Sequence, residues 1–157
     1  MATTEKTNEV TPSSPKKGYD NAMPSSRARI ISLVIGDTFC FLVFAAIGRG
    51  SHGEATGLGA IPQIVQTALP FLTGWFLVAP FAGAFRRAVA ANPRKMLSRT
   101  LLSWVLAWPV AMAIRGLFVD HAVPPLTFAL ITLVFNTLFL LLWRWPYALN
   151  NSIKGRR

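Results

Sequence analysis

The chain has 157 residues, of which 52% are hydrophobic and only 14% are charged, and its formal net charge is +10. This length fits a single domain. A positive charge of this size would suggest a nucleic acid as the partner of a soluble protein. The basic residues, however, stand in short clusters beside long apolar runs, which a soluble monomer could not expose to water. The pattern therefore argues against nucleic acid and predicts an all-α integral membrane protein.

Residues 1–28 are rich in Thr, Ser, Pro, Lys and Glu, and they show no apolar periodicity. This composition predicts a disordered tail. It is not typical of a signal peptide, because the polar stretch is too long and no small-residue cleavage site follows the first apolar run.

Four apolar runs are each long enough to cross a bilayer as a helix. They span residues 30–47, 64–85, 100–119 and 126–143. We expect Pro70, Pro80 and Pro109 to bend these helices at helix contacts, where neighbouring groups can take up the freed carbonyls. The runs together predict a compact bundle of four transmembrane helices over residues 29–147.

The distribution of Lys and Arg predicts the orientation, because these residues stay preferentially on the cytoplasmic side of a membrane. Fourteen of the sixteen fall in the N-terminal tail, the loop after the second run or the C-terminal end; Arg49 and Arg115 are the exceptions. We therefore expect a plasma (inner) membrane protein with both termini in the cytoplasm and residues 148–157 as a basic tail. The basic segments would face anionic lipids of that leaflet.

Asp37 lies about seven residues into the first run, roughly 10 Å below the inner boundary at a rise of about 1.5 Å per residue. An ionised carboxylate at this depth must be paired or it becomes protonated. Asn136 in the fourth run falls at a similar depth, and we expect it to be the direct partner; Ser103 in the third run is a shallower alternative. Arg115 lies roughly 12 Å away along the bundle axis, too far for a direct pair. Asp37 is either functional or a contact that fixes helix packing.

Arg115 lies near the outer end of the third run. It could extend outward to Asp120 or Glu54, as long basic side chains do at membrane surfaces. It could also lean into the bundle, because helical side chains lean toward the N-terminus of their helix. It shares a helical stripe with Trp104 and Trp108, a pattern more typical of packing than of a ligand site.

The segment 48–54 follows the first run on the outer side, and its glycines allow a tight turn or a close backbone approach. Arg49 stands outside against the charge bias, which suggests a specific partner such as Asp120 or an anionic ligand. A Gly-rich run with an arginine could form an anion-binding nest, and the alternative is an ordinary loop.

The two outer loops hold histidines and carboxylates of the kind that bind divalent metals. They are His52, Glu54, Asp120 and His121. Their spacing does not require a metal, and the sequence contains no catalytic, nucleotide-binding or cofactor-binding motif. We therefore predict neither a metal site nor a cofactor. Cys40, the only cysteine, is expected to be a buried small apolar residue.

Several different short motifs, spread along the chain from the first apolar run to the end of the fourth, carry a family resemblance. They are Gly36-Asp37, Phe41, Phe44-Ala45-Ala46, Gly48-Arg49, Ser51-His52-Gly53, Pro70-Phe71-Leu72, Gly74, Arg115 and Trp143-Arg144. In them the chain resembles an uncharacterised family of small bacterial and archaeal membrane proteins, the domain of unknown function 3054, over about residues 31–144. The resemblance implies a four-helix membrane domain and a shared set of Asp37, Arg49, His52 and Arg115. It implies no substrate, cofactor or reaction.

Three classes of function remain open. The first is a non-catalytic accessory or assembly subunit of a larger membrane complex, in which buried polar groups hold the helices together. The second is a small oligomeric transporter or channel that uses Asp37 and Arg115, with Arg49 attracting anions. The third is a membrane-embedded enzyme that uses His52 as acid or base. We favour the first, and expect that the chain is not an enzyme. Candidate functional residues are Asp37, Arg49, His52, Arg115 and Asn136.

Overall fold

The computed structural model describes residues 25–51 and 58–154. They form the helices α2 (Ser26–Ser51), α3 (Ile61–Val78), α4 (Arg87–Ala90), α5 (Pro93–Arg115) and α6 (Leu126–Lys154). A 3₁₀ turn, η1 (Leu58–Ala60), precedes α3, and a π-helical turn, η2 (Gly116–Asp120), follows α5. Four of these helices, α2, α3, α5 and α6, are long and apolar enough to cross a membrane. The prediction of an all-α fold with four such helices is confirmed.

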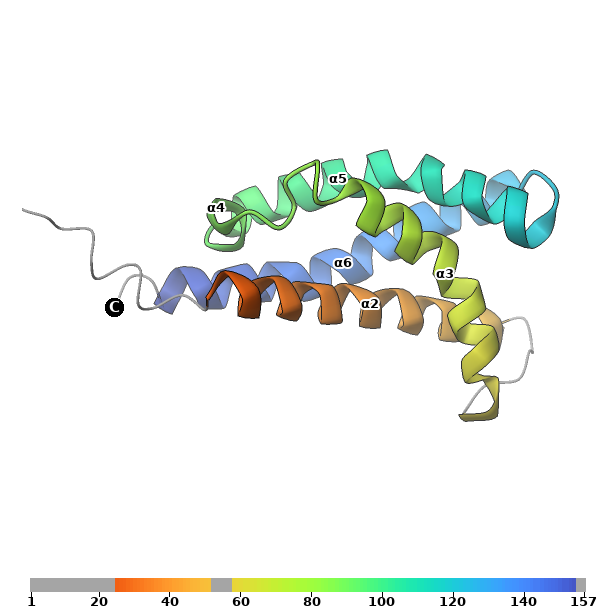
Figure 1. Cartoon of the computed structure of the whole chain (residues 1–157), viewed down its shortest axis with the longest axis horizontal. Coiled ribbons are helices and arrows are strands. Elements are labelled where there is room, and N and C mark those ends of the chain that lie inside the picture. The colour runs from red at the N-terminus through yellow and green to blue at the C-terminus, as the bar shows by residue number, and fades with distance from the viewer. Residues whose placement is uncertain (1–24, 52–57, 155–157) are drawn as a thin grey trace, which may run out of the picture.

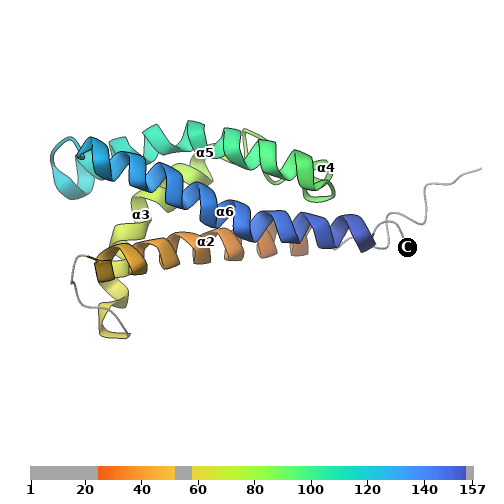
Figure 2. The same cartoon turned by 180° about the vertical axis from the view of Figure 1, so that it is seen from behind.

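The four long helices form a closed bundle in which each packs against two neighbours. Around the bundle, α2 contacts α3, α3 contacts α5, α5 contacts α6, and α6 contacts α2. Helices α2, α5 and α6 lie along the long axis, whereas α3 crosses them obliquely (Figures 1 and 2).

Most of the described basic residues lie at one end of the bundle. This end holds the start of α2, the short helix α4, the start of α5 and the end of α6 (Figure 1). We call it the basic end; its exposed basic residues are Arg27, Arg86, Arg87, Arg94, Lys95, Arg99 and Lys154. The end of α2, η1 and η2 lie at the opposite end, which we call the far end.

Large apolar side chains cover the outside of the bundle, as a lipid environment requires. Phe39 of α2 and Leu142 and Val134 of α6 are each more than half exposed. The interior contains fully buried aromatic rings, among them Trp75 and Trp104. In water this apolar exterior would be unfavourable, so the surface pattern agrees with helices that contact lipid.

Small residues let α3 and α5 approach closely. A Cβ atom added at Gly74 would lie 2.8 Å from the Cβ of Ala111 and 3.0 Å from the carbonyl oxygen of Ala107. Because hydrophobic burial does not drive helix association in lipid, close packing at such small residues takes over that role.

Helix α3 is shorter than predicted, ending at Val78 instead of Phe85. Pro80 has no amide hydrogen to continue the helical hydrogen bonds, so the helix ends in a turn and does not continue as a bent helix. The turn is closed by the amide of Ala84, which donates to the carbonyl of Ala79 at 3.0 Å, and by Gly83, whose φ of 78° suits glycine. The predicted helix kink at Pro80 is therefore wrong.

Other boundaries differ too. Pro109 lies inside α5 but is exposed, so the expectation that it sits at a helix contact is wrong. Helix α2 continues through Gly48 to Ser51, and α6 continues to Lys154, which makes residues 148–154 of the predicted C-terminal tail helical. Most of the predicted N-terminal tail lies outside the described residues.

Candidate functional site

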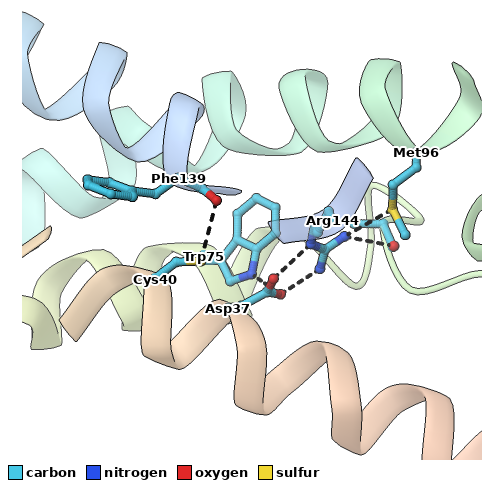
Figure 3. A network of polar contacts seen from close by, with 7 residues as sticks. Asp37, Cys40, Trp75, Met96, Phe139 and Arg144 are labelled. Carbon is cyan, nitrogen blue, oxygen red and sulfur yellow. Dashed lines mark hydrogen bonds and ion pairs between the residues drawn. The ribbon is translucent and has the colours of Figure 1, made fainter. Parts of the chain in front are cut away.

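A buried ion pair between α2 and α6 is the central polar feature of the bundle. The Nε atom of Arg144 donates to Oδ1 of Asp37 at 2.8 Å, and Nη2 donates to Oδ2 at 2.5 Å. Both side chains are 0% exposed. Figure 3 shows the guanidinium of Arg144 and the carboxylate of Asp37 facing each other across the interior. Two parallel charge-assisted hydrogen bonds of this kind are the strongest arrangement available to an arginine and a carboxylate.

Both members of the pair make further hydrogen bonds. Nε1 of Trp75 donates to Oδ2 of Asp37 at 2.9 Å. Nη1 of Arg144 donates to the carbonyl oxygen of Ala84 at 3.1 Å and lies 3.8 Å from Sδ of Met96. We call these five residues the central network (Figure 3).

Aromatic rings complete the surroundings of the arginine. Its guanidinium carbon lies 5.0 Å from the ring centroid of Trp75 and 4.9 Å from that of Phe85. Cation–π attraction is strongest where water is excluded, as it is here. The central network thus joins α2, α3, the turn after α3, α5 and α6 at one point, with the buried charges neutralised and hydrogen-bonded.

Asn136 is not the partner of Asp37, and that prediction is wrong. Its Nδ2 donates instead to the carbonyl oxygen of Thr132 in its own helix, at 2.9 Å. Arg144 is the partner of Asp37 instead. Helix α6 extends beyond Arg144, so the side chain of Arg144 can lean back along the helix toward Asp37.

Indole groups bond α5 to α6 across the bundle. Nε1 of Trp104 donates to the carbonyl oxygen of Leu133 at 3.1 Å. Nε1 of Trp108 donates to the carbonyl oxygen of Ala129 at 3.0 Å and lies 3.2 Å from Oγ1 of Thr132. The tryptophan stripe of α5 therefore serves helix packing, with each indole hydrogen on the neighbouring helix.

Four buried side-chain oxygen atoms have no hydrogen-bond partner within the described residues: Oγ1 of Thr100, Oγ of Ser103, Oδ1 of Asn136 and Oη of Tyr147. The first three belong to fully buried residues of α5 and α6. The contacts of Met96 with Arg144 and of Trp108 with Thr132 define the antiparallel register of α5 and α6. In that register Ser103 lies opposite Asn136. A buried oxygen without a partner in the protein is a position that an internal water molecule can satisfy.

Arg115 pairs with Asp120 at the far end of the bundle, one of its two expected outward partners. Nε donates to Oδ2 at 2.9 Å and Nη2 to Oδ1 at 3.1 Å, and the guanidinium lies 4.5 Å from the ring centroid of Phe128. The two side chains are 17% and 28% exposed. This pair is therefore partly hydrated and separate from Asp37.

The π-helical turn η2 brings Asp120 back toward Arg115 and borders an apolar hollow. The hollow has a volume of about 560 Å³, and its lining includes Met112, Leu117 and His121. His121 has a positive φ of 49° where the turn ends. The carboxylate of Asp120 is engaged by Arg115.

The remaining candidates lie on or near the far end. Arg49 occupies the last turn of α2, whereas His52 and Glu54 lie outside the described residues. Gly48 is helical, and a Cβ added there would meet nothing within 4 Å, so neither a tight turn nor a close backbone approach occurs at this glycine. Across residues 25–51 and 58–154, no group of three His, Cys, Asp or Glu side chains could hold a metal.

The predictions missed Trp75 and assigned Arg144 only a topological role. One signal was available for Arg144: Thr132, Asn136 and Arg144 lie on one face of α6, and all are buried. A polar stripe on an otherwise apolar helix points to the bundle interior. Nothing in the sequence distinguished Trp75 from the other tryptophans.

The helices and the network define the class: a helical membrane protein whose interior is cross-linked by a buried ion pair. The family model described as "Protein of unknown function (DUF3054)" matches residues 34–147, and the chain belongs to this family. Comparisons with curated proteins and with solved structures gave no match.

Proposed function

We propose that this chain is a non-catalytic accessory or assembly subunit of a membrane complex, in which the bundle acts as a rigid framework. The observation that supports this is the central network, because its only two charges, Asp37 and Arg144, are engaged with each other and with surrounding groups. A charge held in this way stabilises one packing of the helices and is already neutralised by its partner, so it is not free to bind a substrate ion.

In the proposed orientation the basic end faces the cytoplasm of a plasma (inner) membrane. The exposed arginines and lysines around α4 and the start of α5 support it, because such residues stay on the cytoplasmic side. The same residues would meet anionic lipids or an acidic surface of a partner subunit.

The test uses a variant that removes the charges but preserves the packing. Replacing a buried ion pair by apolar residues of similar size is often neutral, whereas removal of one partner leaves an unpaired buried charge. We expect the double variant Asp37→Leu/Arg144→Met to fold like the wild type. Tagged chain at native expression level, extracted with mild detergent, should migrate with a stoichiometric companion, and the double variant should retain that companion.

Two results would contradict the proposal. One is a wild-type chain that migrates alone, or only with copies of itself, from native membranes. The other is a double variant that melts like the wild type but loses the companion, because the charges would then act beyond holding the helices. The single variant Asp37→Asn serves as the matched unfolding control, since it should lose both stability and companion.

A small oligomeric transporter is the second candidate, and one observation favours it. The unpartnered buried oxygens of Thr100, Ser103 and Asn136 lie between the ion pair near the basic end and the pair at the far end. Such oxygens could line a path for water or protons. Purified wild-type chain in liposomes with a trapped pH dye should then conduct protons, and the double apolar variant should not. The accessory role predicts no conductance from either.

A further inference from the structure

Arg29 is a buried arginine without a counter-ion in the part of the chain that the structure describes. The residue is 6% exposed, and its Nε has no hydrogen-bond partner. The described residues contain two carboxylates, and each is bound by another arginine: Asp37 by Arg144 and Asp120 by Arg115. A buried arginine is stabilised only when an anion or a set of acceptors is brought to it.

Other groups around Arg29 add positive potential. Arg29 lies in the first turn of α2, where unpaired amides give the helix its positive end, and that turn contains no acidic residue. Arg27 is exposed beside it, and Lys154 ends α6 at the same end of the bundle (Figure 1). Together they raise the positive potential at this end of the bundle, which favours an anion there.

An apolar groove begins two helical turns further along α2. It has a volume of about 300 Å³ and lies between α2 and α6. Its lining residues are Gly36, Phe39, Cys40, Val43, Phe139, Leu142 and Trp143. Phe39 and Leu142 are 66% and 74% exposed, so the groove opens to the outside of the bundle.

Arg29 and the groove lie on the same face of α2. Seven residues separate Arg29 from Gly36, which is two turns of an α-helix and about 10 Å at 1.5 Å per residue. A positive site and an open apolar groove therefore follow each other along one face of α2, in the direction from the basic end into the membrane.

We propose that this face of α2 is a binding site for one anionic phospholipid, with its phosphate at Arg29 and one acyl chain in the groove beside Phe39, Val43 and Leu142. A phospholipid supplies both an anion and an apolar chain at this spacing. A second copy of the chain could supply apolar side chains, but both described carboxylates are already bound within the bundle. The site depends on the helices contacting lipid, and not on the accessory role proposed above.

The experiment measures lipid retention by native mass spectrometry of the full-length chain. The protein is released from nanodiscs that contain equal amounts of phosphatidylglycerol and phosphatidylcholine. We expect the wild type to retain one phosphatidylglycerol. Arg29→Gln should lower the retained fraction about tenfold, the effect of losing one charge-assisted contact. The matched control Arg27→Gln removes the same charge from an exposed side chain, and should stay within about threefold of wild type.

A second pair of variants tests the groove. Val43→Trp fills it and should also lower retention about tenfold, whereas Val105→Trp, on the exposed face of α5, should leave retention unchanged. Leu142→Trp fills the groove from α6 and replaces Val43→Trp if that variant unfolds. Equal loss in Arg29→Gln and Arg27→Gln would mean diffuse attraction and would overturn the proposal. Unchanged retention in Arg29→Gln would also overturn the proposal; this result would follow if residues outside the described part of the chain neutralised Arg29. Unchanged retention in the groove-filling variants would exclude the acyl-chain site.

Discussion

The bundle contains two arginine–carboxylate pairs of similar geometry and different surroundings. Both are bidentate, with donor–acceptor distances between 2.5 and 3.1 Å. Asp37 and Arg144 are separated by 107 residues and are fully buried, whereas Arg115 and Asp120 are five residues apart and partly exposed. The first pair joins distant helices, and the second closes a local turn.

This difference shows that geometry alone does not set what an ion pair contributes. A pair in contact with water gains little, because water would solvate each charge almost as well. A buried pair has no such alternative, and the loss of one member leaves a charge in apolar surroundings. The buried pair of Asp37 and Arg144 should therefore contribute strongly to the stability of the fold, whereas the partly exposed pair of Arg115 and Asp120 should contribute little.

The largest effect is expected from Asp37→Asn, which leaves Arg144 buried without its counter-charge. The free energy of unfolding should fall by about 3–5 kcal/mol. Reversible unfolding in mixed micelles of SDS and a mild detergent measures it. A change below about 1 kcal/mol, comparable to an exposed pair, would show that the two pairs are energetically alike.

A bulky residue at Gly36, beside Asp37, should give the next largest effect. A Cβ atom there would lie 1.9–2.3 Å from three indole atoms of Trp143, so α2 and α6 must move apart or the indole must shift. Gly36→Leu should lower the free energy of unfolding by about 1–3 kcal/mol, typical of overpacking. Gly48→Ala, where a Cβ meets nothing within 4 Å, is the matched control in α2 and should not destabilise. Equal effects of the two would indicate that α2 and α6 are loosely packed.

The four-helix architecture could be predicted because it depends on composition alone. A run of apolar residues about 18 long crosses a bilayer whatever its neighbours are. The end of α3 could not be placed in this way, because the residues after Pro80 are as apolar as those before it. The chain turns there through local bonds that close around Ala84 and Gly83.

The centre of the site could be predicted in part. A carboxylate as deep as Asp37 requires a partner, and this requirement was clear from the sequence. The identity of the partner depended on where α6 ends. If α6 ended at Trp143, Arg144 would lie in water and would only help to set the orientation of the chain in the membrane. Because α6 continues to Lys154, Arg144 lies inside the bundle. A helix boundary, the least certain part of sequence interpretation, therefore decided which residue was assigned to Asp37.

The indole bonds between α5 and α6 should have intermediate strength. Trp104→Phe keeps most of the buried ring but removes the hydrogen donated to the carbonyl of Leu133. That carbonyl also accepts from Oγ1 of Thr137, so it is not left without a donor. We expect a loss of about 0.5–1.5 kcal/mol in the same unfolding assay. Trp145→Phe, at a 49% exposed position of α6, is the control. A loss as large as that of Asp37→Asn would place the main cross-link of the bundle in the tryptophan stripe.

The smallest effect is expected at the far end, from Asp120→Asn. Arg115 keeps its contact with the ring of Phe128 and gains water in place of the carboxylate. The free energy of unfolding should therefore change by less than about 1 kcal/mol. Added salt should reduce even this difference, because mobile ions screen partly exposed charges. The same salt series should leave the loss in Asp37→Asn unchanged, since ions do not enter the bundle interior. If salt diminished both losses equally, water would have to reach Asp37 and Arg144, and the inner pair could no longer be regarded as a dry cross-link between α2 and α6.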